Sequence, residues 1–294
     1  MGHPGMSISK ALVLCPTWNR PYCAKRWLKN MFEECSTSEI ANITLLNDGG
    51  FPETQKVADD YILKDNFFYL EVSKSLGIPS MHNLAIKNFY KEGQYLVICE
   101  DDNYFYTPAW LQIVINEMEK DKTIGVIVRE VDHYGETKPE NIDIQKIKEV
   151  DEDALGVFKV ISPEAVESMG FMRNIYGRYG HEDHDFIYRI FYSGFKICQI
   201  SKQAVKCIHG KVDENGEFYS YHNPPEWDSY SRLVKMGLAE EDDIHHKYHK
   251  LMANKEIYKY KHRKGESLKE KYFDDNEKFV TIIHSDEKSM RTFK

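Results

Sequence analysis

The chain has 294 residues, of which 41% are hydrophobic, enough for one large α/β domain with a tail or two modest domains. Its formal net charge of −8 argues against a protein that coats nucleic acid over its whole surface. The six cysteines form no CxxC pair and the apolar runs are too short to cross a bilayer, so we expect reduced thiols in a cytoplasmic protein. We expect residues 1–9 to be a disordered start or a cloning remnant.

The first part of the chain alternates between apolar runs typical of buried strands and segments with helical spacing. The predicted strands are Ala11–Cys15, Ile43–Leu46, Phe67–Glu71 and Tyr95–Cys99. The predicted helices are a stretch that ends near Glu34, then Pro52–Leu63, Pro79–Lys91 and Trp110–Lys120. This alternation predicts a mostly parallel, doubly wound sheet, in which ligands bind beyond the carboxyl ends of the strands.

The second part is less regular. Residues Val131–Asp153 are polar and charged, and they predict a long excursion over the sheet. The elements expected next are Leu155–Ile161 as a strand, a helix capped by Ser162, a helix over Glu182–Tyr192, and strands at Phe195–Ile200 and Ala204–Ile208. Past Asp228 the sequence is polar and basic, and we expect a mainly helical extension over residues 228–294.

Two acidic clusters are the main chemical signal. Glu100-Asp101-Asp102 follows a predicted strand, where carboxylates suit a hard divalent cation. Glu182-Asp183 opens a predicted helix, where a carboxylate can act as a general base, although acidic residues in a first helical turn also stabilise the helix dipole without chemistry. Asp185 and Arg189 have the i, i+4 spacing of a helical ion pair.

Several motifs between Lys10 and Gly210 resemble those of GT-A-fold glycosyltransferases, most closely family 2. Pro16-Thr17-Trp18-Asn19-Arg20 resembles the nucleotide-binding turn, and Asn47-Asp48-Gly49-Gly50 resembles the turn whose Asp contacts the base or ribose. Gly77 and Asn83 have the spacing of the G-x-x-x-A-R-N helix start, with Met81-His82 in place of Ala-Arg. Arg20 and Lys74 are candidate diphosphate contacts and Trp18 a candidate stacking partner for the base, with surface charge and core packing as the alternatives.

The two acidic clusters also match family motifs. Glu100-Asp101-Asp102 resembles the DxD motif, which implies Asp102 as a ligand of Mn²⁺ or Mg²⁺ and Glu100 or Asp101 as support for the ribose and the metal. A register that pairs Asp101 with Asn103 stays open. The segment from Gly180 to Asp185 resembles the G-x-E-D-x-D segment of galactosyltransferase-like enzymes, which implies Asp183 as the base and Glu182 as an acceptor contact. His209 matches the later histidine that completes the metal shell.

The resemblance implies a metal-dependent transfer of a sugar from a nucleotide-diphosphate sugar, with UDP-sugar favoured, to an acceptor hydroxyl with inversion. It implies a catalytic domain over 10–227, with a nucleotide-sugar half at about 10–108 and an acceptor half at about 155–227. Candidate residues of the acceptor site are Tyr176, Tyr179 and His181.

The acceptor is open. Between His245 and Lys271, nine Lys and Arg and three Glu give +9 − 3 = +6, interleaved with tyrosines. That composition suits a polyanionic acceptor, either an anionic glycan or DNA with hydroxymethylated bases, although a solvated helical face has the same composition. Two further hypotheses are a nucleotidyltransferase, disfavoured because Pro16–Arg20 contains no glycine, and a non-catalytic nucleotide- or glycan-binding module.

Overall fold

The structure of the protein is a computed structural model. It describes residues 9–129, 146–150, 158–170, 172, 182–216, 218–219, 280–284 and 291–292. Among the helices of these residues, none is long and apolar enough to cross a membrane. All six cysteines lie within the described residues, where they are buried and form no disulfide with one another.

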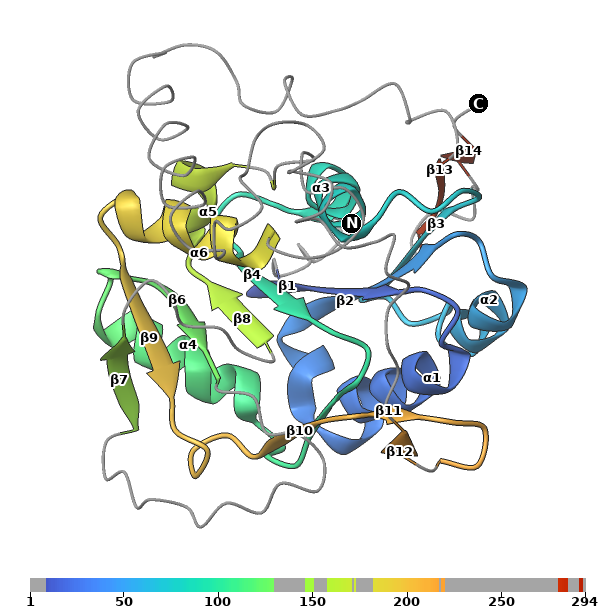
Figure 1. The fold of residues 1–294 in the computed structure, drawn as a ribbon, viewed down its shortest axis with the longest axis horizontal. Helices are drawn as coiled ribbons and strands as arrows, with labels where there is room; N and C mark the ends of the chain where they lie inside the picture. The colour runs from blue at the N-terminus through green and yellow to red at the C-terminus, as the bar shows by residue number, and fades with distance from the viewer. Residues whose placement is uncertain are drawn as a thin grey trace, which may run out of the picture.

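A ten-stranded sheet forms the centre of the molecule, in the order β14-β13-β3-β2-β1-β4-β8-β6-β9-β7 (Figure 1). Neighbouring strands are parallel from β3 to β4 and again between β6 and β9, whereas β8 runs antiparallel between β4 and β6. The bounds of these strands are β1 Ala11–Thr17, β2 Ala41–Asp48, β3 Phe67–Val72, β4 Tyr95–Cys99, β6 Ile124–Val128, β8 Phe158–Ile161 and β9 Lys196–Ile200. The predicted mostly parallel sheet is confirmed.

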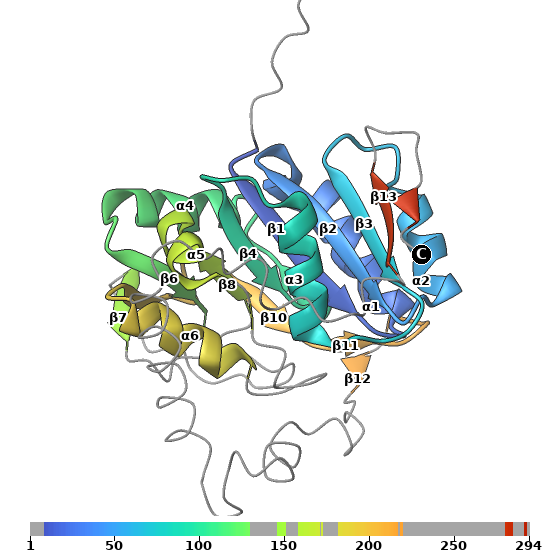
Figure 2. The ribbon, with the colours of Figure 1, turned by 90° about the horizontal axis from the view of Figure 1, so that it is seen from above.

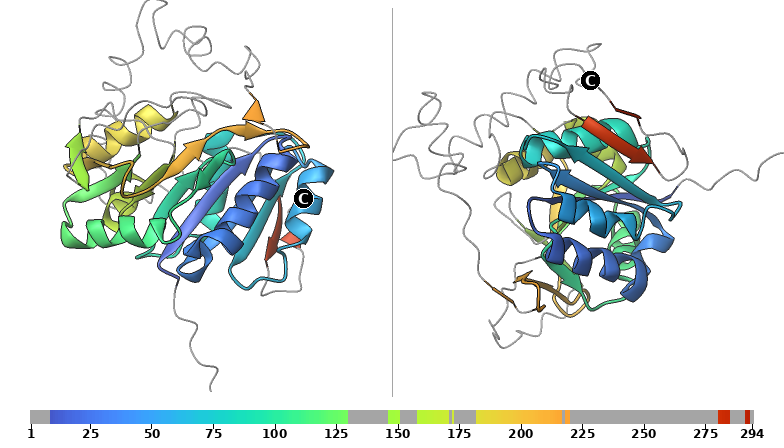
Figure 3. Two further views of the ribbon diagram at one scale, coloured as in Figure 1. Left: turned by 90° about the horizontal axis from the view of Figure 1, so that it is seen from below. Right: turned by 90° about the vertical axis from the view of Figure 1, so that its right-hand side faces the viewer.

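Helices cover both faces of the sheet, as Figures 2 and 3 show. One layer contains α1 (Pro21–Lys29), α2 (Pro52–Asp59) and α4 (Trp110–Lys120), and the other contains α3 (Ile78–Phe89), α5 (Pro163–Met169) and α6 (Glu182–Tyr192). Because successive side chains of a strand point to opposite faces, β1 contributes to both cores. Val13 packs in the core with Trp27, and Leu14 in the core with Met81.

Strand β7 (Ile147–Val150) contradicts part of the predicted excursion over Val131–Asp153. It pairs antiparallel with β9 at the edge of the sheet, and its side chains are half-buried or exposed. An edge strand of this kind lacks the continuous apolar run from which buried strands are predicted. The sequence also gives no prediction for β6, which places Val126 against Ile161 of β8.

The opposite edge of the sheet is formed by the end of the chain. Strand β13 (Val280–His284) pairs antiparallel with β3, and β14 (Arg291–Thr292) pairs with β13. These two segments are strands within the extension that is predicted to be mainly helical, and the rest of residues 228–294, on which that prediction depends, lies outside the described residues. The β-branched run Val280-Thr281-Ile282-Ile283 favours a strand, and β3 otherwise offers unpaired backbone groups at this edge.

A short ribbon beside the sheet brings a late part of the chain back to the end of β4. Strand β10 (Cys207–His209) pairs antiparallel with β5 (Asn103–Phe105), in a register that sets His209 opposite Asn103. The sequence places this later strand at Ala204–Ile208, so the predicted strand starts three residues and ends one residue too early. After it, β11 (Lys211–Val212) pairs with β12 (Phe218–Tyr219). Ahead of β2, a π-helical turn (Asn30–Glu34) and a 3₁₀ turn (Ser36–Glu39) follow α1.

Candidate active site

Two buried carboxylates, Asp101 and Asp102, lie just beyond β4, and the turn after β1 holds them. Thr17 Oγ1 donates to Asp101 Oδ2 at 2.6 Å, and Arg20 lies 2.7 Å from Asp101 Oδ1 and 3.1 Å from Asp102 Oδ2. Burial and the neighbouring Asp102 raise the pKa of Asp101 to about 6, against the opposing charge of Arg20. Burial alone would lower the pKa of Arg20, but the two carboxylates outweigh it and raise that pKa. The arrangement follows from the parallel pairing of β1 with β4, because their carboxyl ends meet at one edge.

His209 joins the same cluster from β10. Its Nε2 lies 2.9 Å from Asp102 Oδ1 and 3.2 Å from Glu100 Oε2. One ligand atom from each of Glu100, Asp102 and His209 lies within 4.8 Å of the others. Burial alone would lower the pKa of His209, but its hydrogen bonds to the two carboxylates raise that pKa to about 10. Burial would raise the pKa of Asp102, and His209 and Arg20 instead hold it well below its usual range.

The geometry distinguishes the two registers left open by the sequence. Asp102 lies beside His209, whereas the Asn103 side chain turns inward, with Nδ2 3.5 Å from the sulfur of Cys99. We therefore take Asp102 as the candidate ligand from this strand end, and its metal role stays a prediction.

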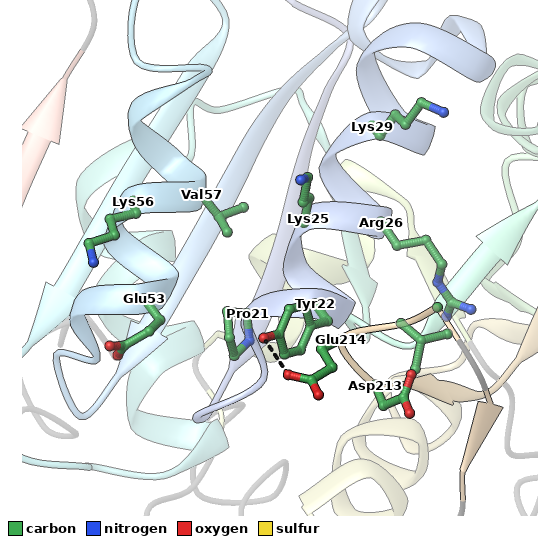
Figure 4. A pocket seen from close by; sticks show the side chains of 12 residues that line it. Pro21, Tyr22, Lys25, Arg26, Lys29, Glu53, Lys56, Val57, Asp213 and Glu214 are labelled. Carbon is green, nitrogen blue, oxygen red and sulfur yellow. Dashed lines mark hydrogen bonds between the residues drawn. The ribbon is translucent and has the colours of Figure 1, made fainter.

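Arg26 of α1 holds the backbone of the cluster in place by hydrogen bonds. Its Nη2 donates to the carbonyl oxygens of Asp102 at 3.0 Å and Gly210 at 2.5 Å, and the Gly210 amide donates to the same Asp102 oxygen. Arg26 also lines a groove of about 540 Å³ between α1, α2 and the turn after β11 (Figure 4). In that groove Tyr22 Oη lies 3.5 Å from Glu214. The groove contains none of the candidate catalytic carboxylates.

The second acidic cluster lies on α6, which covers the same face of the sheet as α3. Asp183 Oδ2 lies 2.9 Å from Nζ of Lys159 on β8, and 29% of the Asp183 side chain is exposed. Glu182 is buried, and burial together with the charge of Asp183 raises its pKa to about 8. The two neighbours therefore differ: the raised pKa favours the protonated form of Glu182, whereas the carboxylate of Asp183 is paired with an ammonium group.

Electrostatic interactions link the two clusters. Lys159 of β8 lies directly opposite Ile98 of β4. Because Glu100 is two residues after Ile98, it points to the same face of the sheet and lies diagonally from Lys159. Both the pKa of Lys159 and that of Glu182 respond to the charge of Glu100. The Glu100 side chain is 40% exposed. Glu100 therefore links the two clusters: it lies 3.2 Å from His209 in the first and acts electrostatically on Lys159 and Glu182 in the second.

Three predicted donor-site residues have structural partners. Asp48 accepts hydrogen bonds from Ser75 Oγ and from the amides of Leu76 and Gly77, at 2.6–3.0 Å. It thus anchors the loop from β3 to α3, which needs the left-handed φ of 87° at Gly77.

Asn83 is buried and exchanges two 2.8 Å hydrogen bonds with the backbone of Met172. His82, in the place of the family arginine, is also buried, and burial lowers its pKa to about 4.

The remaining predicted residues of the donor half line the turn and the loop near these carboxylates. Trp18 is half-buried and packs edge-on against Phe51, with ring centroids 5.6 Å apart. Asn19 is exposed with φ 50°, Pro16 is buried, and Lys74 is exposed on the loop before α3. The candidate acceptor residues Tyr176, Tyr179 and His181 and the basic segment 245–271 lie outside the described residues.

Two residues of the site are missed by the sequence reasoning. Lys159 interrupts the apolar run Phe158–Ile161. A charged residue inside a buried strand requires a partner of opposite charge, and this signal could have identified it. Arg26 lies in an ordinary amphipathic helix and gives no such signal. The predicted ion pair of Asp185 and Arg189 is confirmed at 3.0 Å, buried on the same helix.

Known proteins share this fold. A structure of S. aureus TarS residues 1–349 in complex with UDP-GlcNAc matches with a TM-score of 0.59 at 17% identity, covering 85% of this chain and 71% of that one. A structure of GalNAc-T7 with UDP, GalNAc and Mn²⁺ matches with a TM-score of 0.56 at 15% identity, covering 68% of this chain and 43% of that one. At these identities the similarity shows the GT-A fold.

The sequence comparisons are more specific. The chain is 26% identical over 102 residues to "Uncharacterized glycosyltransferase MG025" of Mycoplasma genitalium, a match that spans 34% of each protein. The profile of glycosyl transferase family 2 matches residues 12–185, from β1 to the second acidic cluster. Since that match covers more than half of the 294 residues, the chain belongs to glycosyl transferase family 2.

Proposed function

We propose that this glycosyltransferase moves a sugar from a UDP-sugar to an acceptor hydroxyl with inversion, in a reaction that depends on a divalent cation. The observation that supports the proposal is the pair of acidic clusters, Glu100, Asp102 and His209 in one and Asp183 in the other, which the charge of Glu100 links through its effect on Lys159. UDP-GlcNAc is bound to TarS, and UDP and Mn²⁺ are bound to GalNAc-T7, which supports the choice of donor and cofactor.

The residues at the end of β4 fit a Mn²⁺ or Mg²⁺ ion. Glu100, Asp102 and His209 offer two carboxylates and an imidazole, a donor set that suits Mn²⁺ and, through its oxygens, Mg²⁺. With only three protein groups offered, positions remain for water and for phosphate oxygens. When bound, the cation would stabilise the negative charge of the departing diphosphate.

Asp183 supplies the base. Its carboxylate accepts the proton of the acceptor hydroxyl as the acceptor oxygen forms a bond to the anomeric carbon. The bond from that carbon to the diphosphate oxygen breaks, and its electron pair leaves with UDP. Attack from the side opposite the leaving group inverts the configuration. The raised pKa of Glu182 favours its neutral form, which leaves Asp183 as the charged group of the pair. Glu182 itself contacts the acceptor.

The donor side of the proposed site consists of three segments. They are the turn Pro16–Arg20, the loop with Lys74 and Gly77 that Asp48 anchors, and the first half of α3 with Asn83. Arg20 forms ion pairs with both Asp101 and Asp102, which places its guanidinium group beside the proposed cation site, where the donor diphosphate would bind. Trp18 lies beside it, within reach of a base. We propose these contacts for the nucleotide half of the donor.

Metal binding is expected to release a proton. In the metal-free protein His209 is protonated at pH 7.5, because its pKa is raised to about 10, and an imidazole must be neutral to bind a metal. Calorimetric titration with Mn²⁺ in buffers of different ionisation enthalpy should therefore report release of about one proton per ion, and affinity should rise with pH. The same titration of His209→Asn should show no such release. Equal heats in all buffers for the unaltered protein would contradict this role of His209.

The function itself is tested by incubating the purified protein with UDP-GlcNAc, UDP-Gal, UDP-Glc and GDP-mannose and measuring release of the nucleoside diphosphate. We expect release from at least one UDP-sugar in the presence of Mn²⁺, and loss of that release when EDTA is added. Consumption of GDP-mannose alone would overturn the choice of UDP, and unchanged turnover in EDTA would overturn the metal dependence.

A further inference from the structure

Lys159 occupies a position where a lysine is costly. Its side chain is 4% exposed, on a strand whose other residues, Phe158, Val160 and Ile161, all pack in the two cores. A buried ammonium is retained when a nearby negative charge outweighs its loss of hydration. The group that meets it is the carboxylate of Asp183, 2.9 Å away.

The charges around Asp183 come from four elements. On α6, Glu182 is its neighbour, and Asp185 is already paired with Arg189. Beyond β4 lies Glu100, and on α3 lies His82, whose pKa responds to both Asp183 and Lys159. Burial favours the neutral form of His82, so among the described residues named here Lys159 is the one that brings a positive charge to Asp183. Removal of Lys159 takes away this ammonium while the carboxyl groups of Glu100 and Glu182 stay.

We propose that Lys159 is a positioning residue for the transfer reaction, which holds the carboxylate of Asp183 in place and keeps it ionised so that it can accept the proton of the acceptor. This inference rests on the proposed role of Asp183 as the base. The sheet fixes Lys159, since β8 is paired on both sides with β4 and β6. The helix that carries Asp183 is thereby tied to the same strands that carry Glu100.

The pH dependence follows from the sign of this interaction. An ammonium beside a carboxylate favours its ionised form, so removal of Lys159 raises the pKa of Asp183. A base with a raised pKa is protonated over a wider range of acidic pH, and the acidic limb of the rate profile moves to higher pH. A side chain that merely packs in the sheet would leave this limb where it is.

The test compares Lys159→Met and Lys159→Gln, which remove the charge, with Lys159→Arg, which keeps it. Two variants without charge ensure that a folding defect in one does not decide the result. Lys196→Met is the matched control, because Lys196 also lies on a strand of the sheet and is 3.2 Å from an aspartate, Asp121, at the surface. The pKa of Asp183 is read from protein labelled with ¹³C at the aspartate carboxyl carbons, with Asp183→Asn identifying its signal.

We expect the pKa of Asp183 to rise by about one unit or more, a tenfold change in its protonation equilibrium, in both uncharged variants. Lys159→Arg and Lys196→Met should leave it within a few tenths of the original value. The acidic limb of Mn²⁺-dependent UDP-GlcNAc hydrolysis, in which water replaces the acceptor, should move in the same direction. An unchanged pKa of Asp183 in the uncharged variants would overturn the inference.

Failure of the underlying function is recognised separately. If Asp183→Asn hydrolyses UDP-GlcNAc as fast as the unaltered protein, Asp183 is not the base, and the role of Lys159 in transfer falls with it. If Asp183→Asn is inactive and the Lys159 variants show no shift, the base assignment stands and the inference about Lys159 alone is wrong.

Discussion

Replacing Asp183 with asparagine is expected to reduce turnover about 10³-fold, while the affinity for UDP stays within about twofold. The amide keeps the size of the side chain but does not accept the acceptor proton, and general base catalysis commonly contributes about 10²–10⁴-fold to a rate. The donor contacts proposed above come from the ends of β1, β2 and β4, the loop before α3 and α3 itself, and none of them comes from α6, which is why binding should survive. Rates of UDP release and calorimetric titration with UDP measure the two quantities.

Asp121→Asn is a suitable control for this substitution. Asp121 is 41% exposed and pairs with Lys196 at the surface, so its loss should leave both turnover and UDP affinity unchanged. Full activity of Asp183→Asn would exclude Asp183 as the base. A parallel loss of UDP binding would show instead that Asp183 supports the donor site.

Replacing Asp102 with alanine is expected to weaken binding of Mn²⁺ at least about 100-fold. Loss of residues that only orient metal ligands already costs about 10–100-fold in affinity, and Asp102 is proposed as a ligand itself. The substitution also leaves His209 with Glu100 as its remaining carboxylate partner in the cluster. Free Mn²⁺ measured by electron paramagnetic resonance, at increasing total Mn²⁺, gives the affinity directly.

Glu117→Gln controls for the general effect of removing a carboxylate, because Glu117 lies on α4, away from the strand end, and pairs with Lys120 and with Lys146 just before β7. It should bind Mn²⁺ as the unaltered protein does. If Asp102→Ala retains full affinity, the cation is held by other groups and the cluster of Glu100, Asp102 and His209 is not the metal site.

Local sequence patterns were sufficient for the donor half of the fold. The strands β1 to β4 are buried on both faces, so each is a continuous apolar run, and an acidic turn after such a run marks the binding edge of a parallel sheet. Asp48 and Glu100–Asp102 could be found in this way. The same reasoning fails at the edges, where β7 is half exposed and β13 pairs with a strand some two hundred residues earlier in the chain.

The relations within the site depend on long-range pairing, which the sequence does not display. Lys159 reaches Asp183 because β8 lies antiparallel beside β4, and His209 reaches Asp102 because β10 returns to β5. Asp48 illustrates a second limit: its spacing suggests a contact to the nucleotide, whereas its carboxylate also holds the amides of Leu76 and Gly77. Residue type and spacing identify such a carboxylate, but only the fold reveals its partners.

The measurement that tests the account most directly is calorimetric titration of the protein with UDP, with and without Mn²⁺. The account predicts binding that depends on Mn²⁺ and is lost in Asp102→Ala. Tight UDP binding that is the same in EDTA, or equal in Asp102→Ala, would contradict the proposal that the cluster at the end of β4 holds a cation for the donor diphosphate.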